Sequence, residues 1–334
     1  MLVRRLRRLG QPGQPLRHLR QRVPAGSTCL HRRGFGRQPQ HFLPRSHRAA
    51  GDRLRPSGAG TGDVGAVRRR PRCSRHQPPT LARLNPPPRI LLITGAASGI
   101  GAVLARRLAA PGVALALHTR ANRAGLEATA AAARAAGAVT ETLLGDLADP
   151  DTPAALVAVT LARFGRIDAL IANAGFADAT PLAELTDTAL SRSIETILAG
   201  FARLARAAVA HLPDGTGRIV AVSSFVAHVF RPGVPVFPAS AAAKAGLEAL
   251  VRALAAELAP RGIAVNAVIP GFIRKDAGTR AAVDPARLGA QIAQIPLGRL
   301  GRPEEVAAAI AFLLAPETTG LTGARLAVDG GLTL

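Results

Sequence analysis

The chain has 334 residues and a formal net charge of +22, but residues 1–88 carry about +18 of it, with 20 arginines against Asp52 and Asp63. Both cysteines, Cys29 and Cys73, also lie there, which excludes a disulfide framework or a thiolate metal site from residues 89–334, where we expect no metal. No apolar run reaches the roughly 18 residues that a membrane-spanning helix needs, so we expect a cytoplasmic protein without a membrane anchor.

Residues 1–88 are rich in arginine, proline and glycine and show no helical or strand period. Such a segment buries too little apolar surface to offset chain entropy, so we expect disorder. Three explanations stay open. The start of translation is assigned too far upstream, although Met1 is the only methionine and a later start would need a non-AUG codon. The segment is a targeting sequence that resembles a mitochondrial presequence in composition. The third explanation is a basic arm that binds the phosphates of a nucleic acid. We expect no other part of the chain to bind nucleic acid.

Beyond residue 88 short apolar runs alternate with alanine-rich stretches, which predicts strands and helices in alternation. The runs lack polar alternation, as is typical of parallel strands buried on both faces. The expected fold is therefore α/β: residues 89–334 form a single Rossmann-type doubly wound parallel sheet with helices on both faces. The predicted strands are Ile90–Thr94, Val113–Thr119, Val139–Leu144, Ile167–Ala172, Arg218–Ser223, Ile263–Ile269 and Arg325–Val328. The predicted helices are Ile100–Ala109, Ala124–Ala136, Pro153–Phe164, Thr188–Leu212, Ala239–Leu258 and Pro303–Leu314.

A glycine-rich segment, Thr94-Gly95-Ala96-Ala97-Ser98-Gly99-Ile100-Gly101, joins the first predicted strand to the first predicted helix. Glycines permit a tight turn and a close approach of the backbone to a ligand. The following helix N-terminus offers free N–H groups and a partial positive charge to a pyrophosphate. This position between strand and helix predicts a dinucleotide site rather than an ordinary turn.

The spacing T-G-x-x-x-G-I-G resembles the cofactor signature of the short-chain dehydrogenase/reductase family, in particular its ketoacyl-reductase-like subgroup. Further family features follow in order over residues 89–334: Asp146, Ala172-Asn173-Ala174-Gly175, Ser223-Ser224, Lys244, Pro270-Gly271, and Leu321-Thr322-Gly323 with Val328-Asp329-Gly330-Gly331. The resemblance implies the Rossmann fold, an NAD(P) cofactor, a carbonyl or alcohol substrate, and a homodimer or homotetramer.

The choice of cofactor is expected at the end of the second strand, where the family places an acid to bind the ribose diol of NAD. Here the stretch His118-Thr119-Arg120-Ala121-Asn122-Arg123 holds no acid. Arg120 offers a guanidinium to a 2′-phosphate, which favours NADP(H) over NAD(H), unless these arginines only form a solvated helix start.

The resemblance also implies roles for other residues of the cofactor site. Asp146 would accept a hydrogen bond from the adenine amino group, and Asn173 and Gly175 would line the adenosine ribose, although Asn173 is equally well read as a structural turn residue. The expected cofactor-binding residues are thus Thr94, Gly95, Ser98, Gly99, Ile100, Gly101, Arg120, Asp146, Asn173, Gly175, Lys244, Pro270 and Gly271.

The family transfers hydride while a tyrosine four residues before the lysine donates the proton. Here Ser240 stands at the tyrosine position before Lys244, and the chain contains no tyrosine. Ile197 stands where the family's supporting asparagine aligns, and Phe237, at the enoyl reductase spacing, has no hydroxyl. The expected catalytic residues are Ser224, Ser240 and Lys244.

An aliphatic hydroxyl is a far weaker acid than tyrosine, so proton donation is expected to be altered or weakened. His228 could protonate an alkoxide, but a lone loop histidine is more often a surface residue. Lys275, where the family commonly has a threonine, either pairs with an anionic ligand or is solvated.

The sequence therefore predicts an NADP(H)-dependent oxidoreductase that acts on a carbonyl or alcohol. One alternative is a catalytically silent NADP(H)-binding protein that acts as a sensor or partner-binding subunit. Another places the function in the basic tail.

Overall fold

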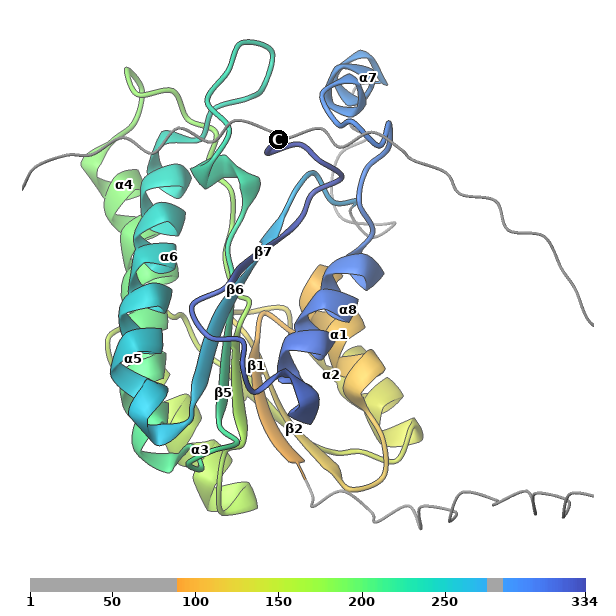
Figure 1. Cartoon of the computed structure of the whole chain (residues 1–334), viewed down its shortest axis with the longest axis vertical. Coiled ribbons are helices and arrows are strands. Elements are labelled where there is room, and N and C mark those ends of the chain that lie inside the picture. The colour runs from red at the N-terminus through yellow and green to blue at the C-terminus, as the bar shows by residue number, and fades with distance from the viewer. Residues whose placement is uncertain (1–88, 275–284) are drawn as a thin grey trace, which may run out of the picture. The chain divides into compact units, whose positions relative to one another are not determined.

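The computed structural model describes residues 89–274 and 285–334 (Figure 1). The expected disorder of residues 1–88 and the expected role of Lys275 therefore lie outside the described residues. Within the described ranges, no helix combines the length and the apolar character needed to cross a bilayer.

The described residues fold around one parallel sheet of seven strands in the order β3-β2-β1-β4-β5-β6-β7. Every neighbouring pair of strands is parallel. This confirms the predicted doubly wound Rossmann-type fold, and each predicted strand is present within two residues of its expected ends. The strands are β1 (Arg89–Thr94), β2 (Val113–Thr119), β3 (Val139–Leu144), β4 (Ala169–Ala172), β5 (Arg218–Val222), β6 (Ala264–Pro270) and β7 (Arg325–Val328).

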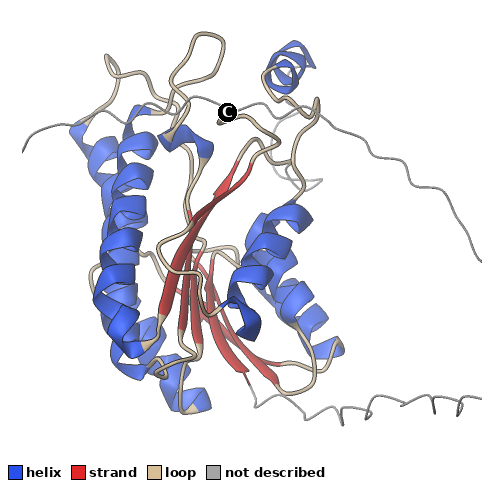
Figure 2. Cartoon of the chain, viewed as in Figure 1, coloured by secondary structure: helices blue, strands red, loops and turns tan. Residues whose placement is uncertain are grey.

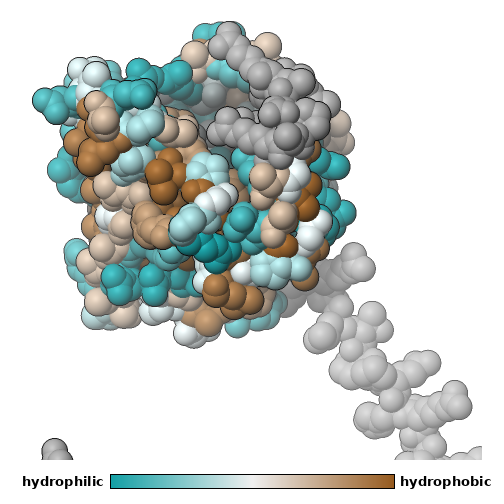
Figure 3. Space-filling model, turned by 90° about the horizontal axis from the view of Figure 1, so that it is seen from above, coloured by the Kyte–Doolittle hydropathy of each residue, from teal (hydrophilic) through white to brown (hydrophobic). Residues whose placement is uncertain are grey.

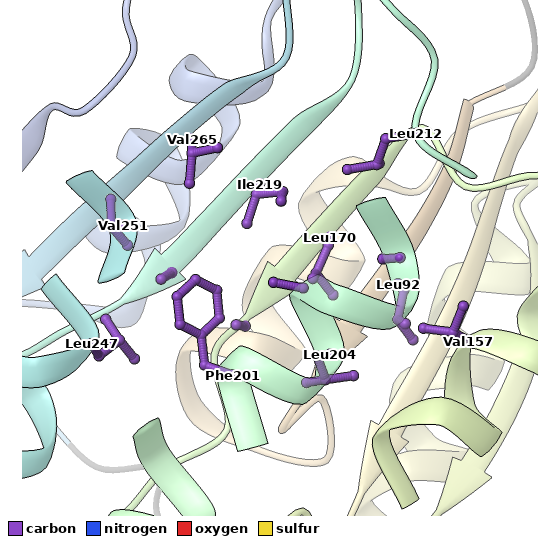
Figure 4. Close-up of a cluster of buried hydrophobic side chains, with 14 of the residues drawn as sticks. Leu92, Val157, Leu170, Phe201, Leu204, Leu212, Ile219, Leu247, Val251 and Val265 are labelled. Atoms are coloured by element: carbon purple, nitrogen blue, oxygen red, sulfur yellow. The ribbon is translucent and has the colours of Figure 1, made fainter. Parts of the chain in front are cut away.

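Helices cover both faces of the sheet (Figure 2). Apolar residues of β1, β4 and β5 point alternately to the two faces, because successive side chains in a strand do so. One core packs Leu92, Leu170 and Ile219 against helices α3, α5 and α6, with Phe201 fully buried at its centre (Figure 4). The other core packs the opposite face against α1, α2 and α8. The helices are α1 (Gly99–Leu108), α2 (Arg123–Ala135), α3 (Thr152–Phe164), α4 (Asp187–Ser193), α5 (Gly200–Ala208), α6 (Pro238–Leu258), α7 (Pro285–Ala293) and α8 (Pro303–Leu314).

The predicted helix Thr188–Leu212 differs from the structure in one respect. It consists of α4, a π-helical segment η1 (Ile194–Ala199), α5 and a short 3₁₀ turn (Val209–His211). A π-helical segment inserts a residue into the helical repeat and is frequent at functional sites. The prediction of one regular helix was therefore wrong in its middle. Helix α7 was not predicted.

A third apolar cluster joins the loops above the carboxyl ends of β5, β6 and β7. It contains Phe225, Val226, Val229, Val234, Ile295 and Leu332, with Phe237 and Phe272 packed against it. The Phe225 ring lies 4.3 Å from that of Phe272, centroid to centroid. This cluster fixes the loops that border the sheet's carboxyl end.

Candidate active site

A cavity of about 660 Å³ opens at the carboxyl ends of the strands. Residues that follow β1, β2, β3, β4, β5 and β6 all line it, so it spans the point between β1 and β4 where the strand order reverses. Ligands of doubly wound sheets bind at this crevice. Figure 3 views this end of the molecule, where apolar side chains lie beside hydrophilic ones.

Ten of the thirteen predicted cofactor residues line this one cavity: Gly95, Ser98, Ile100, Arg120, Asp146, Asn173, Gly175, Lys244, Pro270 and Gly271. Ser224 lines it as well. Thr94, Gly99, Gly101 and Ser240 are not among its lining residues.

The glycine-rich loop has the geometry of a phosphate cradle. A Cβ atom at Gly101 would lie 2.2 Å from the Gly95 carbonyl oxygen, so only glycine lets the helix start so close to the loop. Gly99 has a φ of +55°, which favours glycine, and a Cβ there would meet nothing within 4 Å. Helix α1 begins at that residue, and Ser98 and Ile100 on either side of it line the cavity. The loop therefore fits a dinucleotide pyrophosphate.

Thr94 and Asn173 hold this loop against the end of β4. The Thr94 hydroxyl accepts hydrogen bonds from the backbone N–H groups of Asn173 and Ala174, each at 3.1 Å. The Asn173 side-chain amide donates to the carbonyl oxygens of Thr94 at 3.0 Å and Gly95 at 3.1 Å. The amide is thus engaged in shaping the turn, which is the structural reading of Asn173 that the sequence left open.

The end of β2 presents a cation to the cavity. Arg120 is exposed, and its guanidinium lies 4.0 Å from the Asp146 carboxylate, a loose pair at the protein surface. A surface pair at this distance contributes little. Arg120 can therefore turn toward a phosphate without losing a strong partner.

His118, which the sequence did not assign a role, also lines the cavity although it is 1% exposed. Its Nε2 lies 2.9 Å from the Gly145 carbonyl oxygen, so this nitrogen carries the proton. Burial lowers the pKa of His118, so the ring is neutral. The hydrogen bond ties β2 to the residue before Asp146 and so positions that carboxylate.

Lys244 lies on α6 and lines the cavity. Its Nζ atom donates a hydrogen bond to the Val222 carbonyl oxygen at 2.5 Å. A Cβ atom on Gly175 would lie 3.3 Å from this Nζ atom, so glycine leaves room for it. Burial lowers the pKa of Lys244 to about 8, while the charge of Glu248 opposes the shift. The lysine is thus a group that titrates near the physiological range.

The two predicted catalytic serines lie in different surroundings. Ser224 lines the cavity, and its hydroxyl accepts a hydrogen bond from the Val226 N–H at 3.4 Å. Ser240 is 1% exposed, and its hydroxyl accepts a hydrogen bond from the Asp178 N–H at 2.8 Å. It also lies 3.5 Å from the Phe176 carbonyl oxygen, to which it donates. Ser240 therefore fastens the loop after β4 to α6.

Two further residues of the cavity come from α4 and η1. Thr196 lines it, next to the buried Ile197 at the family's asparagine position. Arg192 lines it one turn earlier, with its guanidinium carbon 6.0 Å from the centre of the Phe176 ring. Phe176 follows Gly175, which lies against Lys244, so Arg192 belongs to the lysine end of the cavity. The sequence did not indicate a role for Arg192, because a single arginine on an exposed helix is a common surface residue.

His228 is not an isolated surface histidine. Its Nε2 lies 2.8 Å from Oε1 of Glu248, and the Ser223 hydroxyl donates to the same oxygen. Glu248 is 3% exposed and stands one helical turn after Lys244. The sequence did not predict this network, because His228 and its partner Glu248 are 20 residues apart.

The chain is similar to known proteins over nearly all the described residues. A family model described as enoyl-(acyl carrier protein) reductase matches residues 95–333. A cis-4-hydroxycyclohexanecarboxylate dehydrogenase of Sinomonas cyclohexanicum is 42% identical over 247 residues, which are 73% of this chain and 96% of that protein. A 3-oxoacyl-(acyl-carrier-protein) reductase of Escherichia coli is 38% identical over 73% of this chain and 97% of its own length.

A short-chain dehydrogenase of Burkholderia cenocepacia, solved in complex with NADP, superposes with a TM-score of 0.69. It is 32% identical, and the match covers 74% of this chain and 99% of the solved one. A blue fluorescent protein from a metagenomic library, solved with NADPH, gives a TM-score of 0.68 at 33% identity, over 74% of this chain and 99% of its own.

Proposed function

Since the chain belongs to the short-chain dehydrogenase/reductase family and is an NAD(P)-dependent oxidoreductase, we propose that it uses NADP(H) to reduce the carbonyl group of a small substrate. The observation that carries the proposal is Arg120, which lines the cavity beyond β2, where an NAD-specific relative would carry an acid. Its guanidinium forms only a loose pair and suits a 2′-phosphate, since arginine binds phosphate in a bidentate manner.

The remaining residues divide the cofactor among them in this proposal. The glycine-rich loop and the α1 N-terminus hold the pyrophosphate, Asp146 faces the adenine, and Lys244 holds the nicotinamide ribose. Pro270 and Gly271 border the nicotinamide end. Gly175, expected at the adenosine ribose, lies against Lys244 and is proposed to border the nicotinamide end as well. When bound, the nicotinamide supplies the hydride.

Ser224 is proposed to bind the substrate oxygen, because its hydroxyl lines the cavity with Lys244. The Ser240 hydroxyl is engaged by the loop after β4, so it would need to exchange these partners before it could pass a proton through a water. Proton donation at the tyrosine position is therefore proposed to be weak. Replacing Ser240 with tyrosine should raise reductase turnover, and an unchanged or lower rate would argue against this view.

The cofactor part is tested by titrating the full chain with NADPH and, separately, NADH while following nicotinamide fluorescence. Saturable binding with NADPH preferred supports the role of Arg120. Absence of binding to a folded sample would contradict both the cofactor and the reductase proposals.

We further propose that the substrate carries a carboxylate, because Arg192 brings a positive charge to the lysine end of the cavity. No ion pair joins Arg192 to an acid within the described ranges, and its guanidinium is positioned by the Phe176 ring. Asp146, the acid that lines the cavity, follows β3 at the adenine end. The name of the relative from S. cyclohexanicum, cis-4-hydroxycyclohexanecarboxylate dehydrogenase, describes a substrate of this kind.

The substrate class is tested with a matched pair of ketones, 4-oxocyclohexanecarboxylate and 4-methylcyclohexanone. The carboxylate should give the higher kcat/KM, and Arg192→Gln should remove most of that preference, about 10-fold to 100-fold for a charged hydrogen bond. Arg206→Gln on the exposed face of α5 is the control and should leave the preference unchanged. Equal preference in wild type and Arg192→Gln would contradict the assignment.

A second candidate function is a catalytically silent NADP(H)-binding subunit. Ser240 at the tyrosine position, with its hydroxyl engaged, and Ile197 at the asparagine position favour it. It predicts tight NADPH binding without turnover of any ketone.

A homodimer or homotetramer is proposed from the family resemblance, with α5 and α6 in the subunit contacts. Sedimentation velocity of the full chain tests this assembly, and a monomer at micromolar concentration would contradict it.

A further inference from the structure

A continuous hydrogen-bonded chain leads from the protein surface to the cavity. The His228 side chain is 25% exposed, and its Nε2 lies 2.8 Å from Oε1 of Glu248. The same oxygen accepts a hydrogen bond from the Ser223 hydroxyl, and Ser223 lines the cavity. Two side chains from the loop after β5 and one from α6 thus connect solvent to the reaction cavity.

Helix geometry and strand ends bring these groups together. Lys244 and Glu248 are four residues apart on α6 and therefore lie on one face of the helix. Ser223 directly follows β5, whose last carbonyl, that of Val222, accepts the Lys244 hydrogen bond. Lys244 and Glu248 thus form hydrogen bonds with two consecutive residues, Val222 and Ser223, at the end of β5.

The Glu248 carboxylate faces charged or titratable groups from three elements. These are Lys244 on its own helix, His228 after the 3₁₀ turn Phe225–Ala227, and Arg325 of β7, whose Nη1 lies 3.5 Å from Oε2. A carboxylate that is 3% exposed is stable only when such partners satisfy it. Oε1 remains the oxygen that joins the surface histidine to the cavity serine.

We propose that Ser223, Glu248 and His228 form the path by which a proton enters the cavity during carbonyl reduction. The proposal rests on the proposed reductase function. It gives the chain a proton supply that does not need the missing tyrosine, and Glu248 acts in it as a positioning and relay residue.

The transfers balance as follows. The carbonyl carbon gains the hydride, and the π electrons of its bond move to the oxygen. Protonated His228 first gives its Nε2 proton to Oε1 of Glu248, so the Ser223 hydroxyl, which donates to that oxygen in the structure, turns to the substrate oxygen. That oxygen then takes the Ser223 proton, and Ser223 regains one from the Glu248 carboxyl group. His228 regains its proton from bulk water. Each transfer breaks one bond to hydrogen and forms one, so the net reaction consumes one hydride and one solvent proton.

Imidazole suits the outer end of such a path because it exchanges protons near neutral pH. Positioned proton transfer typically contributes roughly 10²–10⁴-fold to a rate. Breaking the path should therefore lower the rate of reduction well beyond a packing effect.

The experiment compares His228→Ala and Ser223→Ala with wild type in single-turnover NADPH oxidation with a reducible ketone. Each variant should be slower by at least about 10-fold, while its NADPH affinity stays within about 2-fold. Added imidazole should restore His228→Ala in proportion to its concentration, but should not restore Ser223→Ala. His211→Gln, an exposed histidine after α5, is the control for loss of a histidine and should keep wild-type rates.

A readout without turnover comes from ¹⁵N spectra of the histidine side chains in the cofactor-free chain. Ser223→Ala should move the Nε2 signal of His228, because both groups share Oε1 of Glu248, and His211→Gln should not. Unchanged rates in both variants, or no rescue by imidazole, would overturn the path while the reductase function stands. NADPH binding without turnover in wild type would overturn both proposals.

Discussion

The Nζ atom of Lys244 and the carbonyl oxygen of Val222 form a 2.5 Å hydrogen bond at the end of β5. The contact positions the ammonium group of a residue that lines the cavity, and burial lowers the pKa of this lysine to about 8. The cavity thus contains a cation whose charge depends on pH.

The first prediction concerns alkaline pH. Below about pH 8 Lys244 is charged and can anchor the cofactor ribose, and above it the side chain becomes neutral. NADPH affinity and turnover should therefore fall as pH rises through about 8, with affinity falling by about 10-fold for the loss of one charged hydrogen bond. Fluorescence titrations from pH 6.5 to 9.5 measure this. Lys244→Met should bind more weakly, with no such step in its pH profile.

Replacing Glu248 with glutamine should move that step to lower pH. The carboxylate raises the pKa of Lys244 against the larger effect of burial, so its removal leaves desolvation less opposed. NADPH titrations over the same pH range give the answer independently of proton delivery. A step that stays in place would mean that Glu248 does not act on Lys244.

Arg120→Gln should weaken NADPH binding by about 10-fold to 100-fold and leave NADH binding nearly unchanged, because NADH lacks the 2′-phosphate. Arg123→Gln provides the matched control. Arg123 begins α2 three residues later and is not among the residues that line the cavity. Equal losses in the two variants would indicate general electrostatic attraction instead of a specific contact.

Ser240→Ala should destabilise the protein by about 1 kcal/mol, since the Asp178 N–H loses its acceptor. Urea denaturation of the variant measures the change. Ser191→Ala, on the exposed face of α4, is the control and should have no effect beyond a few tenths of a kcal/mol. If Ser240 instead passes the proton, the variant should lose turnover with little change in stability.

The sequence predicted the sheet well, and most of the expected cofactor residues line one cavity, because both depend on local patterns. The apolar runs mark the strands, and the glycines mark the turn between β1 and α1. At Gly101 a larger residue would clash with the backbone of that turn. Most predicted cofactor residues follow strands, and parallel strands bring their carboxyl ends to one edge.

Other features depend on distances that a linear pattern does not contain. The residues of η1 are ordinary helix-forming residues like those of α4 and α5. Nothing in the sequence therefore distinguishes the π-helical segment from the α-helices on either side. His228 resembles a surface residue until α6 places Glu248 beside it. Ser240 was expected among the catalytic residues, and only the fold shows that its hydroxyl accepts a hydrogen bond from the Asp178 N–H.

The π-helical segment η1 lies between a part of the helix that borders the cavity and a part that packs in the core. Before it and within it, Arg192 and Thr196 border the cavity, and after it Phe201 and Leu204 fill the core. A regular α-helix with the same number of residues would rotate one half against the other by about 100°, one residue's share of a turn, because a π-helical turn holds one residue more than an α-helical turn. The extra residue thus keeps Arg192 and Thr196 on the cavity side while Phe201 and Leu204 stay in the core, so a substitution at either cavity position leaves the core-facing side chains in place.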